Sequence, residues 1–258
     1  MFESLVIWLP RIAGALALVA VATAISRWQH LLLERNLMVA SVRAFVQLLL
    51  IGYALDLIFS ATNPIWMFLI ILVMVTVAGF TAAGRGKGIP GARLIALASI
   101  ALSVVCTLGS LLLLKVFEIE PRFVIPIGGM ITGNAMTATG LVMARLRDDI
   151  ISNRLEIETA LALGATSRQA VRRFLRSALA TGMTPIIDST KTVGLIALPG
   201  AMTGMILAGA SPLEAVQLQI VVMYMLIGAA AFASLSASFL SYAQMFTRDH
   251  QLKILPSN

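Results

Sequence analysis

The sequence predicts an all-α integral membrane protein with about seven transmembrane helices, and three observations support this fold class. First, 59% of the 258 residues are hydrophobic and only 12% are charged, whereas a soluble domain carries roughly 25% charged residues. Second, the apolar residues gather in runs of about the 20 residues that a helix needs to cross the hydrocarbon core. Third, lysine and arginine are concentrated in alternate loops between these runs. We therefore expect a single membrane domain, residues 1–258.

Seven segments are long and apolar enough to be candidate spans. In chain order they are Leu5–Ser26, Met38–Phe59, Ile65–Ala83, Leu94–Phe117, Phe123–Ala144, Thr192–Gly209 and Leu218–Ala243. The fifth and the sixth are the least apolar, because glycine, proline and threonine replace much of the leucine and isoleucine that a lipid-facing helix carries.

The basic residues predict the orientation of these spans. Most of them follow the first, third and fifth spans or lie in the C-terminal tail: Arg27, Arg35, Arg85, Lys87, Arg93, Arg145, Arg147, Arg154, Arg168, Arg172, Arg173, Arg176, Lys191, Arg248 and Lys253. The alternate loops 56–64 and 210–217 contain no lysine or arginine. Because basic loops stay on the cytoplasmic side, the N-terminus is expected outside and the C-terminus in the cytoplasm of a cell (inner) membrane. The net charge of +7 then reflects these loops and membrane lipids, not nucleic-acid binding.

Sequence motifs for catalysis or nucleotide binding are absent. The single cysteine, Cys106, and the two histidines, His30 and His250, give no CxxC or HExxH metal site, and no GxSxG nucleophile motif occurs. The string DSTKT at Asp188–Thr192 sets a lysine beside hydroxyl groups, but it lacks the preceding glycine-rich loop of a P-loop. We therefore expect a chain that is not an enzyme and that binds no cofactor itself.

The loop of residues 145–191 is predicted to be the one large cytoplasmic segment, folded as helix, turn at Gly164, and a second helix that ends at Pro185. Within it, Glu158, Ala160 and Gly164 resemble the EAA–Gly signature of ABC transporter permeases, although the Ile-x-Leu-Pro that continues the importer signature is missing. The resemblance implies a coupling helix that docks into a nucleotide-binding subunit, where small residues allow close approach and glycine allows a sharp turn. The alternative is an amphipathic helix that meets only lipid headgroups.

Several charged residues have two interpretations each. Arg168, Arg172, Arg173 and Arg176 share roughly one helical face, which suits either anionic lipid headgroups or an acidic surface of a partner. Arg43 and Gln47 lie one turn apart in the second span, with Asp188 as a candidate counter-ion near the start of the sixth span and Lys191 as an interfacial anchor. Since charge inside a membrane is costly, this group is either a structural pair or part of an inner gate.

The fifth and sixth spans share an interruption by proline and glycine. IPIGGMITGNAM (125–136) and LPGAMTG (198–204) both run proline, small residues, methionine, threonine, glycine. Unwound backbone survives at membrane depth only where it lines a cavity or is covered by protein, so we expect the two segments to meet antiparallel at midplane. Six side chains would line a pathway there: Met130, Thr132, Asn134, Met136, Met202 and Thr203. The alternative is close helix packing through small residues.

Together with ALGAT around Gly164 and the long block 188–225, IPIGGMITGNAM is similar to the FetB-type permease family, which is associated with ABC-type iron export in bacteria and has plant relatives linked to aluminium tolerance. The similarity includes Arg43-Ala44-x-x-Gln47 with Gly52-Tyr53, and so covers nearly the whole chain. It implies a permease that forms a homodimer and pairs with a separate ABC ATPase subunit, on which ATP and Mg are bound. Under this resemblance, Glu158, Ala160, Gly164, Arg168 and Arg172 are the expected coupling residues.

The resemblance implies export of iron or another metal cation, while the residues leave the ion open. Methionine thioethers favour soft ions, whereas threonine, asparagine and backbone oxygens favour hard ones. Glu118 and Glu120, in the outer loop before the fifth span, are weak candidates for an exit site or simply solvated charges. Two other function classes stay open: a self-sufficient secondary metal transporter or channel, and a membrane scaffold that regulates a partner.

Overall fold

The computed structural model describes residues 2–60, 64–247 and 249–253, which fold into helices joined by short connections. The helices are α1 (Phe2–Trp28), α2 (Glu34–Ser60), α3 (Pro64–Arg85), α4 (Ala92–Leu113), α5 (Pro121–Ser152), α6 (Arg154–Ala162), α7 (Ser167–Ala170), α8 (Arg172–Thr192), α9 (Gly200–Leu207) and α10 (Pro212–Met245). Within the described ranges, extended pairing is limited to two isolated bridges, Val193 with Ala197 and Phe246 with Leu252. The predicted all-α fold class is confirmed.

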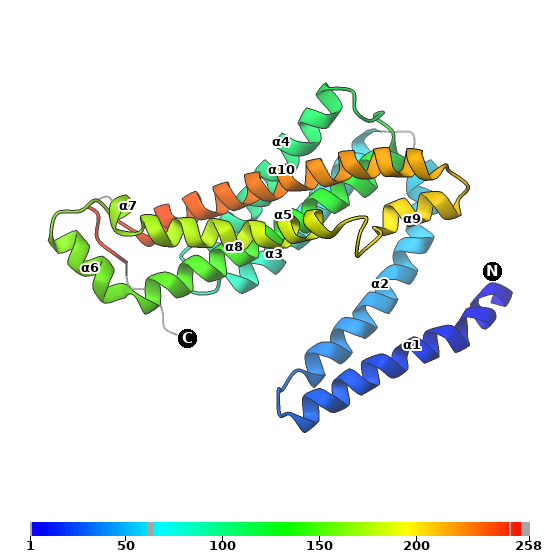
Figure 1. The fold of residues 1–258 in the computed structure, drawn as a ribbon, viewed down its shortest axis with the longest axis horizontal. Helices are drawn as coiled ribbons and strands as arrows, with labels where there is room; N and C mark the ends of the chain where they lie inside the picture. The colour runs from blue at the N-terminus through cyan, green and yellow to red at the C-terminus, as the bar shows by residue number, and fades with distance from the viewer. Residues whose placement is uncertain (1, 61–63, 248, 254–258) are drawn as a thin grey trace. The chain divides into compact units, whose positions relative to one another are not determined.

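The chain divides into two compact units, Met1–Thr62 and Asn63–Asn258. Unit 1 is a hairpin of α1 and α2, which lie antiparallel (Figure 1). The turn between them is fixed by Ser26, whose buried hydroxyl donates to Glu34 Oε1 and accepts from the Leu33 amide, both at 3.2 Å.

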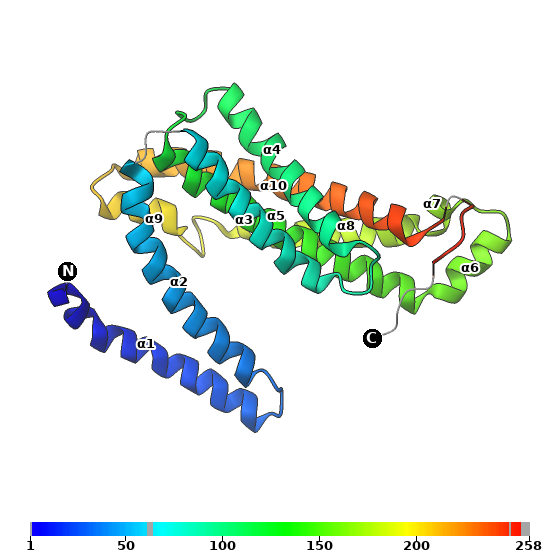
Figure 2. The ribbon, with the colours of Figure 1, turned by 180° about the vertical axis from the view of Figure 1, so that it is seen from behind.

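Unit 2 is a bundle in which α3, α4, α8 and α10 all pack against the central α5, as Figures 1 and 2 show from opposite sides. Small residues let the helices approach closely: a Cβ built on Gly140 of α5 would lie 2.8 Å from the Arg85 side chain at the end of α3. A buried hydrogen bond of 2.7 Å from Ser103 of α4 to the Ala229 carbonyl of α10 ties two further helices together. Hydroxyl-to-backbone bonds of this kind are typical of helix contacts in membranes.

Several helices are long and apolar enough to cross a membrane. In the described part of the chain these are Glu34–Gly52, Ile65–Arg85, Ala92–Leu113 and Pro212–Met245, together with a shorter apolar stretch, Ile12–Trp28. The 32 residues of α5 would extend about 48 Å, well beyond the roughly 30 Å of hydrocarbon. A multi-pass membrane protein is therefore supported, while the count of seven spans and the orientation stay predictions.

The expected break in the fifth span is wrong, because α5 is one continuous helix from Pro121 to Ser152. Pro126 lies inside it but near its beginning, where the missing N–H deprives only the carbonyl of Arg122 of its partner. Around it Ile125, Ile127 and Ile131 are buried against neighbouring helices. This packing holds the helix together through a run of glycines that is a weak helix former by propensity.

The sixth span is interrupted as predicted, but it is not one transmembrane helix. Residues 193–199 are non-helical, and Pro199 stands as the N-cap of α9, which is only 8 residues long. The structure does not support the expectation that this segment meets the fifth span, since α9 packs mainly against α10, and the main neighbours of α5 are α3, α4, α8 and α10.

The second helix of the predicted cytoplasmic loop does not end at Pro185. Instead α8 continues through Pro185 to Thr192 and packs against α5 and α10, burying Phe174, Ala178, Gly182 and Ile186. Much of the segment that was expected to be water-exposed is thus part of the bundle. Pro185 is exposed, so its ring and its missing N–H disturb only the outer side of the helix.

The loops predicted to be cytoplasmic in unit 2 gather at one end of the bundle. Arg147 at the end of α5 donates to the Lys87 carbonyl in the α3–α4 turn at 2.7 Å, and α6 and α7 lie at the same end (Figure 1). The predicted turn at Gly164 is confirmed: α6 ends just before it, and Gly164 has φ +89, a value that favours glycine. A capping box of Thr166 and Gln169 then begins α7.

Candidate functional site

The predicted pathway residues of the fifth span occupy two different environments on α5. Thr132 is buried in the bundle, whereas Met130, Asn134 and Met136 are half-buried. Met130 and Asn134 lie one turn apart, so they share a face of α5 that the other helices of unit 2 leave partly open.

The polar side chains of α5 hydrogen-bond to their own helix. Thr132 donates to the Gly128 carbonyl at 2.7 Å, Thr137 to the Gly133 carbonyl at 3.1 Å, and the Asn134 amide nitrogen to the Met130 carbonyl at 3.2 Å. Each donor is thus satisfied without a second helix. The side-chain oxygens keep their lone pairs and can accept hydrogen bonds or contact a cation.

Met202 and Thr203, the predicted pathway residues of the sixth span, lie on α9, which packs against α10. Met202 lines a cavity of about 320 Å³ together with Thr190 of α8 and Gln219 and Met223 of α10. Gln219 is buried, and its Oε1 has no hydrogen-bond partner among the described residues. The six predicted lining residues therefore do not share one site: Met130 and Asn134 share the open face of α5, Thr132 is buried, and Met202 lines this separate cavity.

The predicted inner-gate residues lie in both units. Arg43 and Gln47 are exposed on α2 in unit 1, one turn apart as expected. Asp188 and Lys191 are exposed on the last turns of α8 in unit 2, and neither forms an ion pair within the described ranges. Since the string DSTKT lies inside a helix, it does not have the loop conformation of a P-loop.

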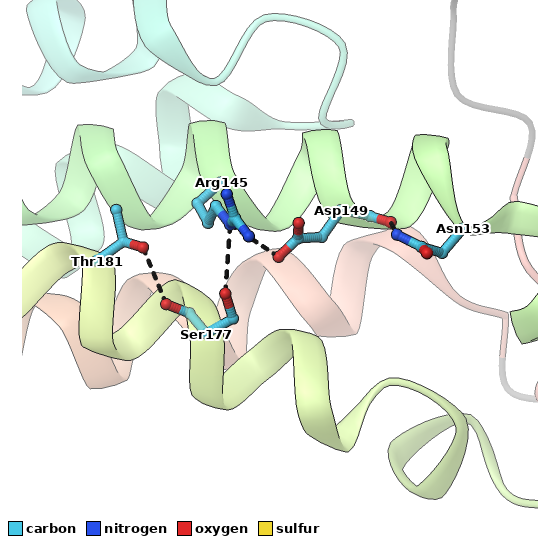
Figure 3. Close-up of polar contacts among 5 residues, drawn as sticks. All are labelled: Arg145, Asp149, Asn153, Ser177 and Thr181. Carbon is cyan, nitrogen blue, oxygen red and sulfur yellow. Dashed lines mark hydrogen bonds and ion pairs between the residues drawn. The ribbon is translucent and has the colours of Figure 1, made fainter.

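A polar cluster that the sequence did not point to joins α5 and α8 at the arginine-rich end. Figure 3 shows Arg145 between Asp149 of its own helix and Ser177 of α8, with Nε at 3.0 Å from Asp149 Oδ2 and 3.3 Å from Ser177 Oγ. One turn beyond Asp149, the amide nitrogen of Asn153 donates to the Asp149 carbonyl, and Asn153 ends α5. The cluster fixes the register of the two helices.

A close approach of α8 to α5 and α10 lies beyond this cluster, at Gly182. A Cβ built there would lie 2.7 Å from Ser234 Oγ of α10 and 3.2 Å from the Ala138 carbonyl of α5. A side chain at this position would require Val142 and Ser234 to move and would crowd the Ala138 carbonyl. The absence of a side chain at Gly182 therefore allows α8 to pack closely against α5 and α10.

The predicted coupling residues lie on α6 and the turn that follows it. Glu158 pairs with Arg154 at 2.7 Å, Ala160 is half-buried, and Gly164 is exposed with open space around it. Two large apolar side chains here are strongly exposed, Leu155 at 79% and Leu163 at 84%. An exposed apolar surface beside charged residues is typical of a protein or membrane contact.

The four arginines after Gly164 do not act as one face. Arg168, Arg172 and Arg176 line a cavity of about 490 Å³ between α7, α8 and α10, and within the described chain none of them has an acidic partner. Arg173 instead pairs with Glu156 of α6 and lies over the ring of Phe174. The first three remain available to an anionic partner, while Arg173 holds α6 to α8.

A second buried contact that the sequence did not reveal ties α7 to the end of α10. The hydroxyl of Ser167 lies 2.7 Å from Tyr242 Oη and 2.9 Å from His250 Nδ1. Because Ser167 is far from Tyr242 and His250 in the sequence, no local pattern could have predicted this contact. It anchors the start of the arginine-rich helix to the C-terminal segment.

The two acidic residues proposed as an exit site are both beside Arg122. Glu120 pairs with it at 2.5 Å and Glu118 approaches it at 4.0 Å; Arg122 and Glu118 are exposed and Glu120 is half-buried. In the part of the chain that the structure covers, no three His, Cys, Asp or Glu side chains gather as a metal site. A resident, fully protein-ligated metal centre thus has no support among these residues.

Comparison with known proteins places these features in a family. The model of the Uncharacterised protein family (UPF0014) matches residues 9–246. The chain is 50% identical to the UPF0014 membrane protein STAR2 of Oryza sativa subsp. japonica, over 93% of this chain and 84% of that protein. It is 48% identical to Protein ALUMINUM SENSITIVE 3 of Arabidopsis thaliana, over 93% of this chain and 88% of that one.

A bacterial relative has a more explicit name. The chain is 38% identical to the Probable iron export permease protein FetB of Escherichia coli (strain K12), over 94% of both chains. No solved structure matches the chain. The resemblance inferred from IPIGGMITGNAM and the block 188–225 is confirmed, and the protein is a member of the UPF0014 family of membrane proteins.

Proposed function

We propose that the chain is the transmembrane permease subunit of an ABC transporter that exports iron or another metal cation. A separate nucleotide-binding subunit would bind ATP and Mg and hydrolyse the ATP. Two copies of the permease would form a homodimer in the inner (cell) membrane. The proposal transfers to this chain what the name of its 38% identical bacterial relative says of that protein, an iron export permease.

The observation that carries the proposal is the form of the α6–Gly164 segment. It combines a short helix, exposed Leu155 and Leu163, and a glycine turn at φ +89, all at the arginine-rich end of the bundle. A coupling helix needs this combination, because it must project from the membrane and contact another subunit while remaining tied to the helices that move. The tie exists here, through the pairing of Arg173 with Glu156.

The remaining coupling residues fit the same role. Arg168 and Arg172 line a cavity beside the turn and lack acidic partners in the described chain. An acidic rim on the ATPase would supply those partners, and charge complementarity of this kind favours the correct orientation of docking. The small side chain of Ala160 would let the surface of the ATPase approach the backbone of α6 near the turn.

The experiment is co-purification with the ATPase, followed by measurement of Fe(II)-stimulated ATP hydrolysis in liposomes. Gly164→Trp should lower the stimulated hydrolysis at least tenfold, because the added ring strains the turn and occupies the docking surface. Gly91→Trp is the matched control: Gly91 also has positive φ, +72, and open space around it, but it lies in the α3–α4 turn.

The outcome separates coupling from general damage. Loss of stimulation in Gly164→Trp with normal hydrolysis in Gly91→Trp would support the proposal. Hydrolysis that is indifferent to Gly164→Trp would contradict it and leave a self-sufficient transporter as the better interpretation.

A further inference from the structure

One side of α8 carries an uninterrupted polar stripe. Ser177, Thr181, Thr184, Asp188 and Lys191 follow one another at helical spacing. The first two are half-buried and the last three are exposed. A stripe that ends in two charged residues is unexpected on a helix that packs within a membrane bundle.

The register between α8 and α5 gives the height of this stripe. The two helices run antiparallel and are joined where Arg145 Nε meets Ser177 Oγ at 3.3 Å. Asn134 and Asp188 each lie about 11 residues farther from this contact, in the same direction, which is close to three full turns or about 16 Å. Both therefore project on the same side as the hydrogen-bonded pair, at matching heights.

The contacts of α5 with α3 place that height inside the membrane. Gly129 lies beside Met74 at the middle of α3, and Gly140 lies beside Arg85 at its end. The 22 residues of α3 extend about 33 Å, which matches the hydrocarbon core. Asn134 is between the two contacts, within about 8 Å of the middle of α3.

Asp188 is thus a carboxylate at membrane depth, and its side chain lacks a partner among the described residues. It forms no hydrogen bond or ion pair through its side chain with any described residue, Lys191 on the next turn included. The other carboxylates described in unit 2 lie toward its ends: Glu118, Glu120, Asp148, Asp149, Glu156, Glu158, Glu214 and Asp249. Ionisable side chains at this depth are costly in lipid and mark substrate or ion pathways.

The groups beside Asp188 offer oxygen atoms. Thr181 and Thr184 donate their hydroxyl protons to carbonyls of α8, at 3.0 and 2.8 Å, which leaves the oxygen lone pairs free. Pro185 has no N–H for the carbonyl of Thr181, so that carbonyl loses its usual partner in the helix. On α5, Asn134 keeps its amide oxygen free.

We propose that the face shared by α5 and α8 is a hydrated cation track, with Asp188 as its binding carboxylate and Asn134 opposite. Its oxygen ligands select a hard divalent or trivalent cation, in preference to a soft ion bound by thioethers. The proposal deepens the proposed function, on which it rests for the assumption that the chain moves a cation. It also moves Asp188 from the inner gate to the middle of the pathway.

The first test needs only the full-length permease in membrane vesicles. In a Cys106→Ser background, Thr184→Cys and Asp188→Cys are treated with a cationic, membrane-impermeant methanethiosulfonate. They should react at least tenfold faster than Leu102→Cys, which is 49% exposed at the middle of α4. Equal, slow reaction at all three positions would mean that the face meets lipid, and it would overturn the proposal.

The second test examines the carboxylate. Fe(II) should slow the labelling of Thr184→Cys at least tenfold when Asp188 is present. In the double variant Thr184→Cys/Asp188→Asn, Fe(II) should leave the labelling rate unchanged. Protection that survives Asp188→Asn would overturn the role of Asp188. Loss of protection in Lys191→Gln to the same extent would indicate a structural Asp188–Lys191 pair and would also overturn it.

The third test separates this proposal from the proposed function. With the ATPase present, Asp188→Asn should lower iron flux at least tenfold while the complex still assembles, and Asp188→Glu should retain a substantial part. Normal flux in Asp188→Asn would overturn the cation track but would not contradict the ABC permease. Absence of ATP-driven flux in the wild type, combined with rapid and protectable labelling, would contradict the ABC permease and leave the cation track standing.

Discussion

At the scale of single residues, Asn134 has the side chain that best distinguishes passage from packing on α5. It is half-buried, and its amide nitrogen is already bonded to the Met130 carbonyl. Packing therefore makes no demand on its oxygen. A cation pathway would require this oxygen, because it is the polar group that α5 presents at the height of Asp188.

Asn134→Leu should reduce metal transport at least tenfold while the transporter remains assembled, since leucine fills a similar volume but offers no ligand. The measurement is iron flux in liposomes, with size-exclusion chromatography to verify assembly. Thr76→Val is the matched control, because Thr76 on α3 also lies at membrane depth and donates to its own helix, to the Leu72 carbonyl at 2.7 Å. Wild-type flux in Asn134→Leu would contradict the prediction and would indicate that Asn134 contributes only to helix packing.

The residue scale also shows where a sequence pattern is informative. Gly164 was predicted to turn the chain, and its φ of +89 confirms this. The pattern of four arginines was less informative, because spacing alone cannot tell that Arg173 pairs with Glu156 whereas Arg168, Arg172 and Arg176 line a cavity. Such pairing depends on how α6 folds back, which local sequence does not specify.

At the scale of helices, α8 is the element that sequence reasoning misjudged most. Its charged and hydroxyl residues indicated a cytoplasmic helix, and Pro185 indicated its end. Tertiary packing decides otherwise, because Gly182 lets the helix approach α5 and α10 and buries Phe174 and Ile186. The polar stripe of α8 begins at the Ser177 contact with Arg145 of α5 and would line the proposed track.

Gly182→Val should destabilise unit 2 by about 1–3 kcal/mol, the usual cost of overpacking a filled contact. The reason is that a Cβ there meets Ser234 and the Ala138 carbonyl within 3.2 Å. Thermal unfolding in detergent measures the effect. Gly228→Ala on α10 is the control, since nothing lies within 4 Å of its Cβ position, and it should unfold at or above the wild-type temperature. Equal stability of Gly182→Val and wild type would contradict the packing described here.

The same comparison explains the outcome for the two interrupted spans. Proline and glycine break the chain at Pro199, where few neighbours hold it and Leu195 and Ile196 remain exposed. They do not break α5, where four helices surround the same kind of sequence. Propensity is a weak determinant that packing overrides, so similar motifs gave one confirmed and one wrong prediction.

At the scale of the whole molecule, composition and charge were sufficient for the class of protein. Long apolar helices and family membership both support a multi-pass membrane protein. In the proposed assembly, two surfaces of this chain would be completed by other subunits: the α5–α8 face and the exposed side of α6. The proposed homodimer and the ATPase would provide them.

The most direct test of the central claim is the dependence of iron flux on the nucleotide-binding subunit. The permease is reconstituted in liposomes with the ATPase, without it, and with an ATPase variant that binds but does not hydrolyse ATP. Flux is expected only with the active ATPase and ATP. Equal flux from the permease alone would contradict it, because the chain would then transport its substrate without coupling to ATP hydrolysis.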